Sequence, residues 1–196
     1  MVKNKWGLEV KPHRICAIDA STNSLAFALF AGDDLESIGK INFEGNNTYE
    51  KVMDAGQKVK AFFDYCGGFE AIIIEHTVFM NSPKTAADLA LVQGAILGAA
   101  GQSGTKIIGK VSPITWQNFI GNKKISKEEQ LAIRSQIPGK SESYYKAHER
   151  MLRKERTIRF INTIYDRSIT DNDVADACGI GHWALKNWGK AIGVDN

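Results

Sequence analysis

Two apolar segments of the chain end in an acidic residue. Asp19 closes the run ICAID, and Glu75 follows three consecutive isoleucines in AIIIE. A carboxylate at the end of a buried strand is costly unless it is paired, hydrogen-bonded or bound to a metal ion. A turn-forming role is an alternative for Asp19, because STNS follows it. This alternative is weaker for Glu75, because glutamate is a poor turn former.

The segment SITDNDVADACGIGHWAL carries three more aspartates. Asp173 and Asp176 are three residues apart, so on a helix both side chains can point to the same side. Asp171 suits the N-cap of that helix, because a short oxygen-bearing side chain there accepts hydrogen bonds from free backbone amides. The pattern therefore predicts a structural role for Asp171 and a functional role for the later pair.

Four carboxylates that converge at the edge of a sheet would repel one another unless cations lay between them. Oxygen ligands without His or Cys favour Mg²⁺, with Mn²⁺ as a substitute, over zinc. Two such ions can activate a water and stabilise the leaving oxygen in a phosphodiester displacement. The hypothesis is a pair of Mg²⁺ ions held by Asp19, Glu75, Asp173 and Asp176, with the same four residues catalytic.

The elements that must position these acids form a mixed sheet flanked by helices. Apolar runs predict strands at 14–21, 25–32, 37–44, 71–75 and 105–111. The first three are consecutive, which predicts an antiparallel meander. Helical spacing and Ser-Pro or Ser-Lys starts predict helices at 47–68, 82–100, 112–121 and 126–137, one or two helices within 142–165, and a last helix from about Asp171. This order predicts an α/β domain.

The composition is that of an ordinary soluble globular protein. The chain has 196 residues, 43% of them hydrophobic, and no apolar run near the ~18 residues that a membrane span needs. The N-terminal segment is polar and basic, and the three cysteines are far apart without zinc-type spacing. We therefore expect a non-secreted, cytoplasmic protein of a reducing compartment, with no membrane association.

Positive charge is concentrated in one part of the chain. The net charge is only +3, but residues 121–168 contain 12 Lys or Arg and 6 Asp or Glu. We predict one domain over 1–196, in which 121–168 is a basic, mainly helical elaboration. That layout suits a nucleic-acid enzyme, although a solvated charged helix explains the charge equally well.

Several segments together resemble the RuvC family of Holliday junction resolvases, which have the ribonuclease H-like fold. The resemblance rests on AIDAS, AIIIEHTVFMNSPKTAADLALVQGAILGAA, GNKKISKEE and DNDVADA; it covers most of 14–130 and resumes at about Asp171. It implies a five-stranded mixed sheet with three antiparallel and then parallel strands, and it implies that the four acids bind the catalytic metals. It also matches Lys127 to a catalytic-site lysine and Phe79 to an aromatic residue near the junction centre, whereas Trp116 replaces a family lysine.

The stretch 131–170 is longer than the family pattern and unlike it. It is rich in Lys and Arg, and we expect it to contact DNA phosphates together with the basic loop before it. The expected DNA-binding residues are Phe79, Lys123, Lys124, Lys127, Lys146, Arg150, Arg153, Lys154 and Arg156.

The expected function is that of a metal-dependent, structure-selective endonuclease that cuts four-way or other branched DNA and leaves 5′-phosphate ends. The near two-fold symmetry of a junction, together with the resemblance, implies a homodimer. One alternative is a broader flap, branched-DNA or RNA/DNA-hybrid nuclease. Another is an actin-like or sugar-kinase ATPase, because DASTNS is similar to a phosphate-binding hairpin, although 196 residues leave little room for its second domain. A catalytically idle binding module is disfavoured, because all four acids are present.

Overall fold

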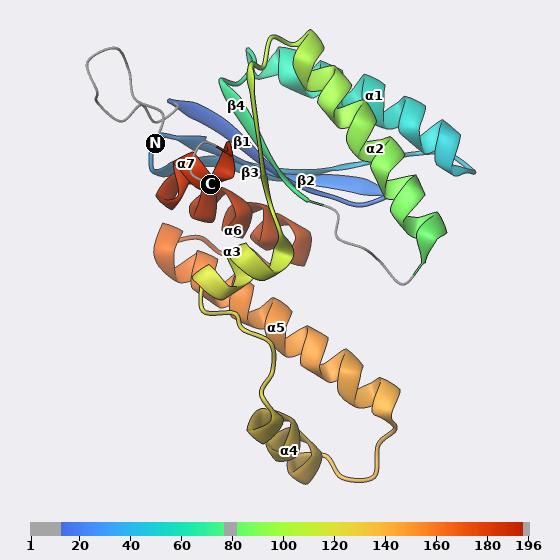
Figure 1. Cartoon of the computed structure of the whole chain (residues 1–196), viewed down its shortest axis with the longest axis vertical. Coiled ribbons are helices and arrows are strands. Elements are labelled where there is room, and N and C mark those ends of the chain that lie inside the picture. Colours follow the sequence, from blue (N-terminus) through green and yellow to red (C-terminus); the bar gives the residue numbers. More distant parts are fainter. Residues whose placement is uncertain (1–12, 77–81, 194–196) are drawn as a thin grey trace.

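Five strands form one mixed sheet in the computed structural model, which describes residues 13–76 and 82–193 (Figure 1). The strands are β1 (Arg14–Ala20), β2 (Ser24–Ala31), β3 (Asp34–Asn42), β4 (Ala71–Glu75) and β5 (Ile107–Val111). Their order across the sheet is β3-β2-β1-β4-β5, with β1, β2 and β3 antiparallel and β4 parallel to both β1 and β5. The predicted α/β fold, with three antiparallel strands and then parallel ones, is confirmed.

Helices cover both faces of this sheet. The helices α1 (Thr48–Tyr65) and α2 (Pro83–Gln102) lie on one face, while α6 (Asn172–Lys186) crosses the other, near α3 (Pro113–Phe119) and α7 (Trp188–Ala191) (Figure 1). The sequence patterns missed α7, because four residues are too few to show a helical period. Across the described parts of the chain, no helix combines the length and the apolarity that crossing a membrane requires.

Side-chain alternation along β1 divides the hydrophobic core into two layers. Ile15 and Ala17 pack in the layer that contains α6, whereas Cys16 and Ile18 pack in the layer formed with α1 and α2. Successive strand residues point to opposite faces of a sheet. Asp19, the next residue in the series, is therefore directed to the α6 side.

The helix α6 lies unusually close to the sheet. A Cβ atom added to Gly181 would be 2.1 Å from Cε2 of Phe30 and 2.9 Å from Cβ of Ala17, and one added to Gly179 would be 2.6 Å from the ring of Trp116. These two glycines allow the helix backbone to approach β1, β2 and α3 without a gap. The aspartates on the first turns of α6 are thereby brought towards the strand ends.

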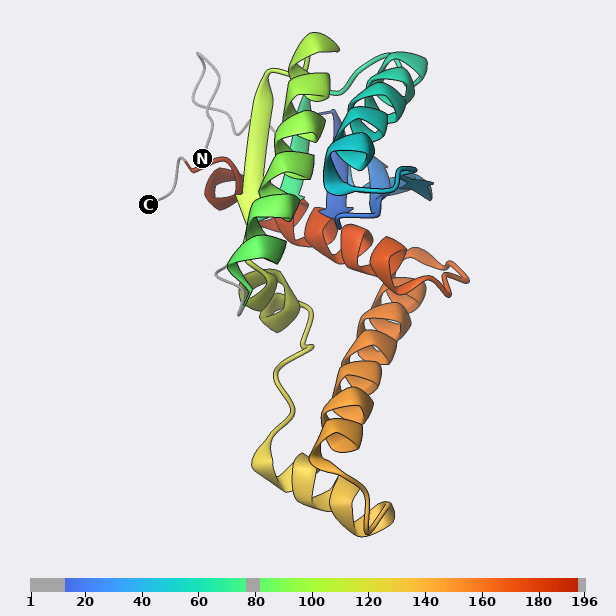
Figure 2. The ribbon, with the colours of Figure 1, turned by 90° about the vertical axis from the view of Figure 1, so that its right-hand side faces the viewer.

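Two helices form an arm that projects away from the sheet (Figures 1 and 2). They are α4 (Lys127–Gln136) and α5 (Glu142–Tyr165), so the range 142–165 is one continuous helix. A small cluster of Ile125, Ile133 and Tyr145, with Leu152 against it, holds α4 to α5. Arg134 pairs with Glu142, and Arg156 with Glu129, across the same contact.

Replacement of Gly181 by alanine is expected to destabilise the protein by about 1–3 kcal/mol, because the new methyl group would overlap buried atoms of Phe30 and Ala17. Chemical denaturation measures the change. Gly56→Ala is the matched control: Gly56 lies within α1 with no atom near an added Cβ, so there alanine should be neutral or stabilise by up to about 1 kcal/mol. Equal effects of the two substitutions would contradict the close packing of α6.

Candidate active site

Two of the four predicted acids lie side by side at one edge of the sheet. β1 and β4 are neighbouring parallel strands in which Ile18 pairs with Ile74, so Asp19 and Glu75 follow at matching positions. Ile18 and Ile74 both pack in the α1/α2 layer. The two carboxylates therefore share the opposite face, which α6 covers.

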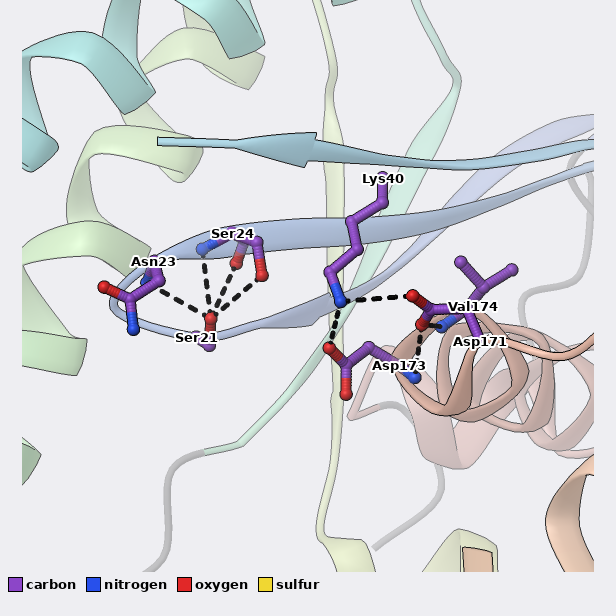
Figure 3. Close-up of polar contacts among 7 residues, drawn as sticks. All are labelled: Ser21, Asn23, Ser24, Lys40, Asp171, Asp173 and Val174. Carbon is purple, nitrogen blue, oxygen red and sulfur yellow. Dashed lines mark hydrogen bonds and ion pairs between the residues drawn. The ribbon is translucent and has the colours of Figure 1, made fainter. Parts of the chain in front are cut away.

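The N-terminal turns of α6 supply the other two acids. Asp171 is the N-cap, and its Oδ1 accepts hydrogen bonds from the backbone amides of Asp173, at 2.8 Å, and Val174, at 3.1 Å (Figure 3). The structural role predicted for Asp171 is confirmed. This cap fixes the start of the helix, and Asp173 and Asp176 follow on its first two turns.

The carboxylates are close enough to influence one another's ionisation. Burial raises the pKa of Asp19 well above its ordinary value, and the negative charges of Glu75, Asp176 and Asp173 raise it further. Burial, with a further contribution from Glu75, raises the pKa of Asp176 from 3.8 to about 7. Burial also raises the pKa of Glu75, against the effect of a hydrogen bond from Trp116. Acids from β1, β4 and α6 thus share one electrostatic environment.

This environment suits a hard divalent cation. The donors are carboxylate oxygens, and a cation would stabilise their charged forms against burial and against the repulsion among Asp19, Glu75 and Asp176. In residues 13–76 and 82–193, however, no three His, Cys, Asp or Glu side chains form a ready ligand group. Glu75 is bonded to Trp116 and Asp173 to Lys40, so an incoming ion would compete for both carboxylates.

Lys40 is a component of the site that sequence analysis missed. Its Nζ lies 2.5 Å from Oδ2 of Asp173 and 3.3 Å from Oδ2 of Asp171 (Figure 3). The strand register explains this position: Asp19 pairs with Ala26, and Ala26 pairs with Lys40, which places Asp19 and Lys40 in one row on one face. The role of Lys40 can be recognised only once the strand register is known. From the sequence alone, a lysine in a polar strand looks like a solvated residue.

Trp116 is a second component that the patterns did not assign. Its ring is fully buried beside Gly179, and its Nε1 donates a hydrogen bond of 2.7 Å to Oε1 of Glu75. A lysine was expected at this position from the family resemblance. Here a neutral indole instead orients Glu75 and adds no positive charge.

The predicted DNA-binding residues are distributed along the arm and its base. Lys123 and Lys124 are exposed on the segment between α3 and α4. The residues of α5 that line surface hollows on its inner side are Lys146, Arg150, Arg153 and Lys154, and the charge of Lys154 lowers the pKa of Asp176. Arg156 is instead paired with Glu129 of α4, which gives it a structural partner.

The predicted catalytic lysine belongs to the arm helix α4. Lys127 is the first residue of α4, and its neighbour Ser126 forms a capping box with Glu129. Through Ile133, Tyr145 and Leu152, α4 packs against α5 in the projecting arm (Figures 1 and 2), so Lys127 is carried on the arm and its catalytic role stays a prediction. Phe79 lies outside the described residues.

Comparison with known proteins gives structural matches only. No protein-family model and no curated protein sequence matches the chain. Thermus thermophilus RuvC in complex with a Holliday junction substrate has a TM-score of 0.65 at 15% identity, over 91% of this chain and 98% of that chain. A second structure of Thermus thermophilus RuvC has a TM-score of 0.63 at 15% identity, with the same coverage.

A more distant match is the yeast mitochondrial Holliday junction resolvase Ydc2. Its TM-score is 0.51 at 13% identity, and the match covers 92% of this chain and 83% of that chain. The fold of the protein is therefore that of the RuvC-like resolvases, as the sequence resemblance implied.

The raised pKa of Asp176 predicts a pH-dependent stability without divalent ions. Between pH 3.8 and about pH 7, the folded protein keeps a proton on Asp176 that the unfolded chain has released. The free energy of unfolding therefore falls as the pH rises through this window. We expect the thermal midpoint in EDTA to fall by roughly 5–10 °C from pH 5 to pH 8, and Mg²⁺ to restore it at pH 8.

Asp176→Asn provides the control for this measurement. The neutral amide cannot lose a proton, so the decline between pH 5 and pH 8 should become shallower. Burial lowers the pKa of His182, which makes stability rise with pH below the ordinary value of 6.5, so the difference between the two proteins is the relevant quantity. Parallel pH profiles would contradict the assignment of the decline to Asp176.

Lys40→Met is expected to strengthen binding of Mn²⁺ by roughly threefold to fivefold, because the ion no longer competes with an ammonium group for Asp173. Isothermal titration of the protein alone measures the affinity. Lys58→Met is the matched control, since Lys58 also bridges two acids, Glu44 at 3.1 Å and Asp54 at 2.9 Å, away from this site. Unchanged or weaker binding by the Lys40 variant would show that this ion pair does not limit access to Asp173.

Proposed function

We propose that the protein is a divalent-metal-dependent endonuclease that cuts phosphodiesters in branched DNA, with four-way junctions as its main substrate. The observation that carries this proposal is the meeting of partly buried carboxylates from β1, β4 and α6 at one edge of a ribonuclease H-like sheet. The solved structures that share this fold include a RuvC bound to a Holliday junction substrate. A cationic arm beside the acids supplies a surface for the DNA backbone.

The proposed roles follow from position and chemistry. Asp19, Glu75, Asp173 and Asp176 would hold two Mg²⁺ ions, for which Mn²⁺ can substitute. Two such ions supply activation of a water and stabilisation of charge on the leaving oxygen, which gives 5′-phosphate and 3′-hydroxyl ends. Among the protein's own groups, Trp116 keeps Glu75 oriented through its indole N–H.

A homodimer is part of the proposal. A four-way junction has near two-fold symmetry and needs two cuts, which two copies of one site related by a two-fold axis can make. Equilibrium sedimentation of the free protein and of its junction complex would measure the number of chains.

The ATPase alternative loses its main support at the hairpin between β1 and β2. The hydroxyl of Ser21 accepts hydrogen bonds from the amides of Asn23, at 3.2 Å, and Ser24, at 3.0 Å (Figure 3). Because two amides of this turn are already bonded within the hairpin, they are not free donors for a nucleotide phosphate. Flap and RNA/DNA-hybrid substrates remain nuclease alternatives that a substrate panel at equal concentration distinguishes.

Asp176→Asn should abolish Mg²⁺-dependent cutting of a synthetic four-way junction, because one carboxylate ligand is lost, while junction binding in Ca²⁺ stays close to that of the unchanged protein. Gel analysis of labelled strands measures cutting, and fluorescence anisotropy measures binding. Asp33→Asn is the control: Asp33 is an exposed aspartate that pairs with Lys186, so its loss should leave both activities intact.

The result that would overturn the proposal is also specific. Persistent cutting by the Asp176 variant would remove this residue from the active site. Failure of the unchanged protein to cut junctions, flaps and hybrids in Mg²⁺ or Mn²⁺ would refute the nuclease function itself.

A further inference from the structure

A small cavity opens beside Asp176, between α3, the segment that follows it, and α5. Its volume is about 140 Å³, and three cations, three neutral polar side chains and one acid line it. The cations are Arg150, Arg153 and Lys154; the neutral groups are Gln117, Asn122 and Thr157; the acid is Asp176. Sequence analysis assigned no role to the three neutral residues.

The walls of the cavity are held by buried hydrogen bonds. Asn122 and Thr157 are almost fully buried, and Nδ2 of Asn122 donates to the backbone carbonyl of Arg153, at 2.8 Å, and to Oγ1 of Thr157, at 2.9 Å. The guanidinium of Arg153 also donates to Oε1 of Gln117. These bonds join the α3–α4 segment to α5, so the cation at this point is positioned rather than freely mobile.

Two polar atoms at this cavity have no partner in the described structure. They are Nε of Arg153 and Oδ1 of Asn122, and both are buried. A buried donor and a buried acceptor without partners are costly, so a polar ligand that reached them would recover hydrogen bonds that the protein alone does not make. A phosphate oxygen matches the guanidinium donor, and a bridging water or hydroxyl matches the amide acceptor.

The cations continue along α5 away from the cavity. Lys146, Arg150, Arg153 and Thr157 are spaced by four, three and four residues, so they lie on one side of the helix. A neighbouring hollow shares Arg150 and Arg153 with the cavity and is lined also by Lys124 and Lys146. The cavity is therefore the inner end of a cationic track that runs along α5 to Asp176.

We propose that this cavity is the seat of one DNA backbone phosphate next to the scissile bond, bound by Arg153 with Arg150 and Lys154, and that Lys146 and Lys124 bind the phosphates that follow. This inference rests on the proposed nuclease function, because DNA is the expected source of a phosphate in this place. Asp176 at the same cavity links the seat to the acids. The arm thus sets which phosphodiester reaches the carboxylates.

The first test compares charge removal on the two sides of α5. Arg153→Gln and Arg150→Gln should each weaken junction binding in Ca²⁺ by about tenfold and reduce the slope of log affinity against log salt by about one. Arg159→Gln is the matched control, because Arg159 is an exposed arginine on the opposite side of the same helix. Arg150 is exposed too, so its variant keeps the test valid if loss of the Arg153 contacts impairs folding.

The second test locates the seat. Single methylphosphonate linkages, which carry no charge, are placed in turn along the strand around the cut site. At one position the neutral linkage should weaken binding by the unchanged protein by about tenfold. At that position it should not weaken binding by Arg153→Gln any further, because this variant has already lost the contact. Inorganic phosphate at millimolar concentration should weaken junction binding by the unchanged protein more than by Arg153→Gln, and equal effects on the two proteins would count against a phosphate seat.

The outcomes separate this inference from the proposed function. One outcome is that the unchanged protein cuts junctions while the losses of binding free energy from the neutral linkage and from Arg153→Gln add at every position. In that case the cavity is not a phosphate seat, and the nuclease function stands. If Arg159→Gln weakens binding as much as Arg153→Gln, the track is not specific. If the unchanged protein neither binds nor cuts branched DNA, both proposals fail.

Discussion

The structure depends on one electrostatic conflict, which is the partial burial of several carboxylates at one edge of the sheet. Asp19 is the last residue but one of β1 and Glu75 is the last of β4, and the close approach of α6 at Gly181 brings its aspartates towards them. Withdrawal from water raises the pKa values of Asp19 and Asp176, and the negative charges of the neighbouring acids raise them further. Protons or cations among the acids therefore stabilise such a site.

The protein places its own cations on two sides of this cluster. Lys40 reaches Asp173 from the edge strand β3, and Lys154 approaches Asp176 from α5. The charge of Lys40 also acts on Asp19, whereas the carboxylate of Glu75 receives a neutral hydrogen bond from Trp116. The arrangement therefore leaves negative charge at the centre and positive charge around it. A phosphodiester drawn along the outer cations would meet the acids at their least compensated point.

The arm is an extension of the core. The side of α5 that packs inside the domain through Thr157 and Ile161 is the same side that carries Arg153, Arg150 and Lys146 further out. One side of α5 is thus buried where the helix packs on the domain and carries cations where the helix projects from it. This continuity gives the cations a fixed direction relative to the acids, which a flexible basic tail would not have.

Local patterns in the sequence determined the strands, the capped helix starts and the set of acids, because alternation, N-cap chemistry and strand-end carboxylates act over a few residues. The role of Asp171 was readable in this way. Only the tertiary structure decided which residues contact these acids. Lys40 joins the site through strand register, Trp116 joins it through the packing of α3 under α6, and Lys127 is carried on the arm because α4 packs against α5. These outcomes depend on contacts between residues far apart in the chain, and no local pattern encodes them.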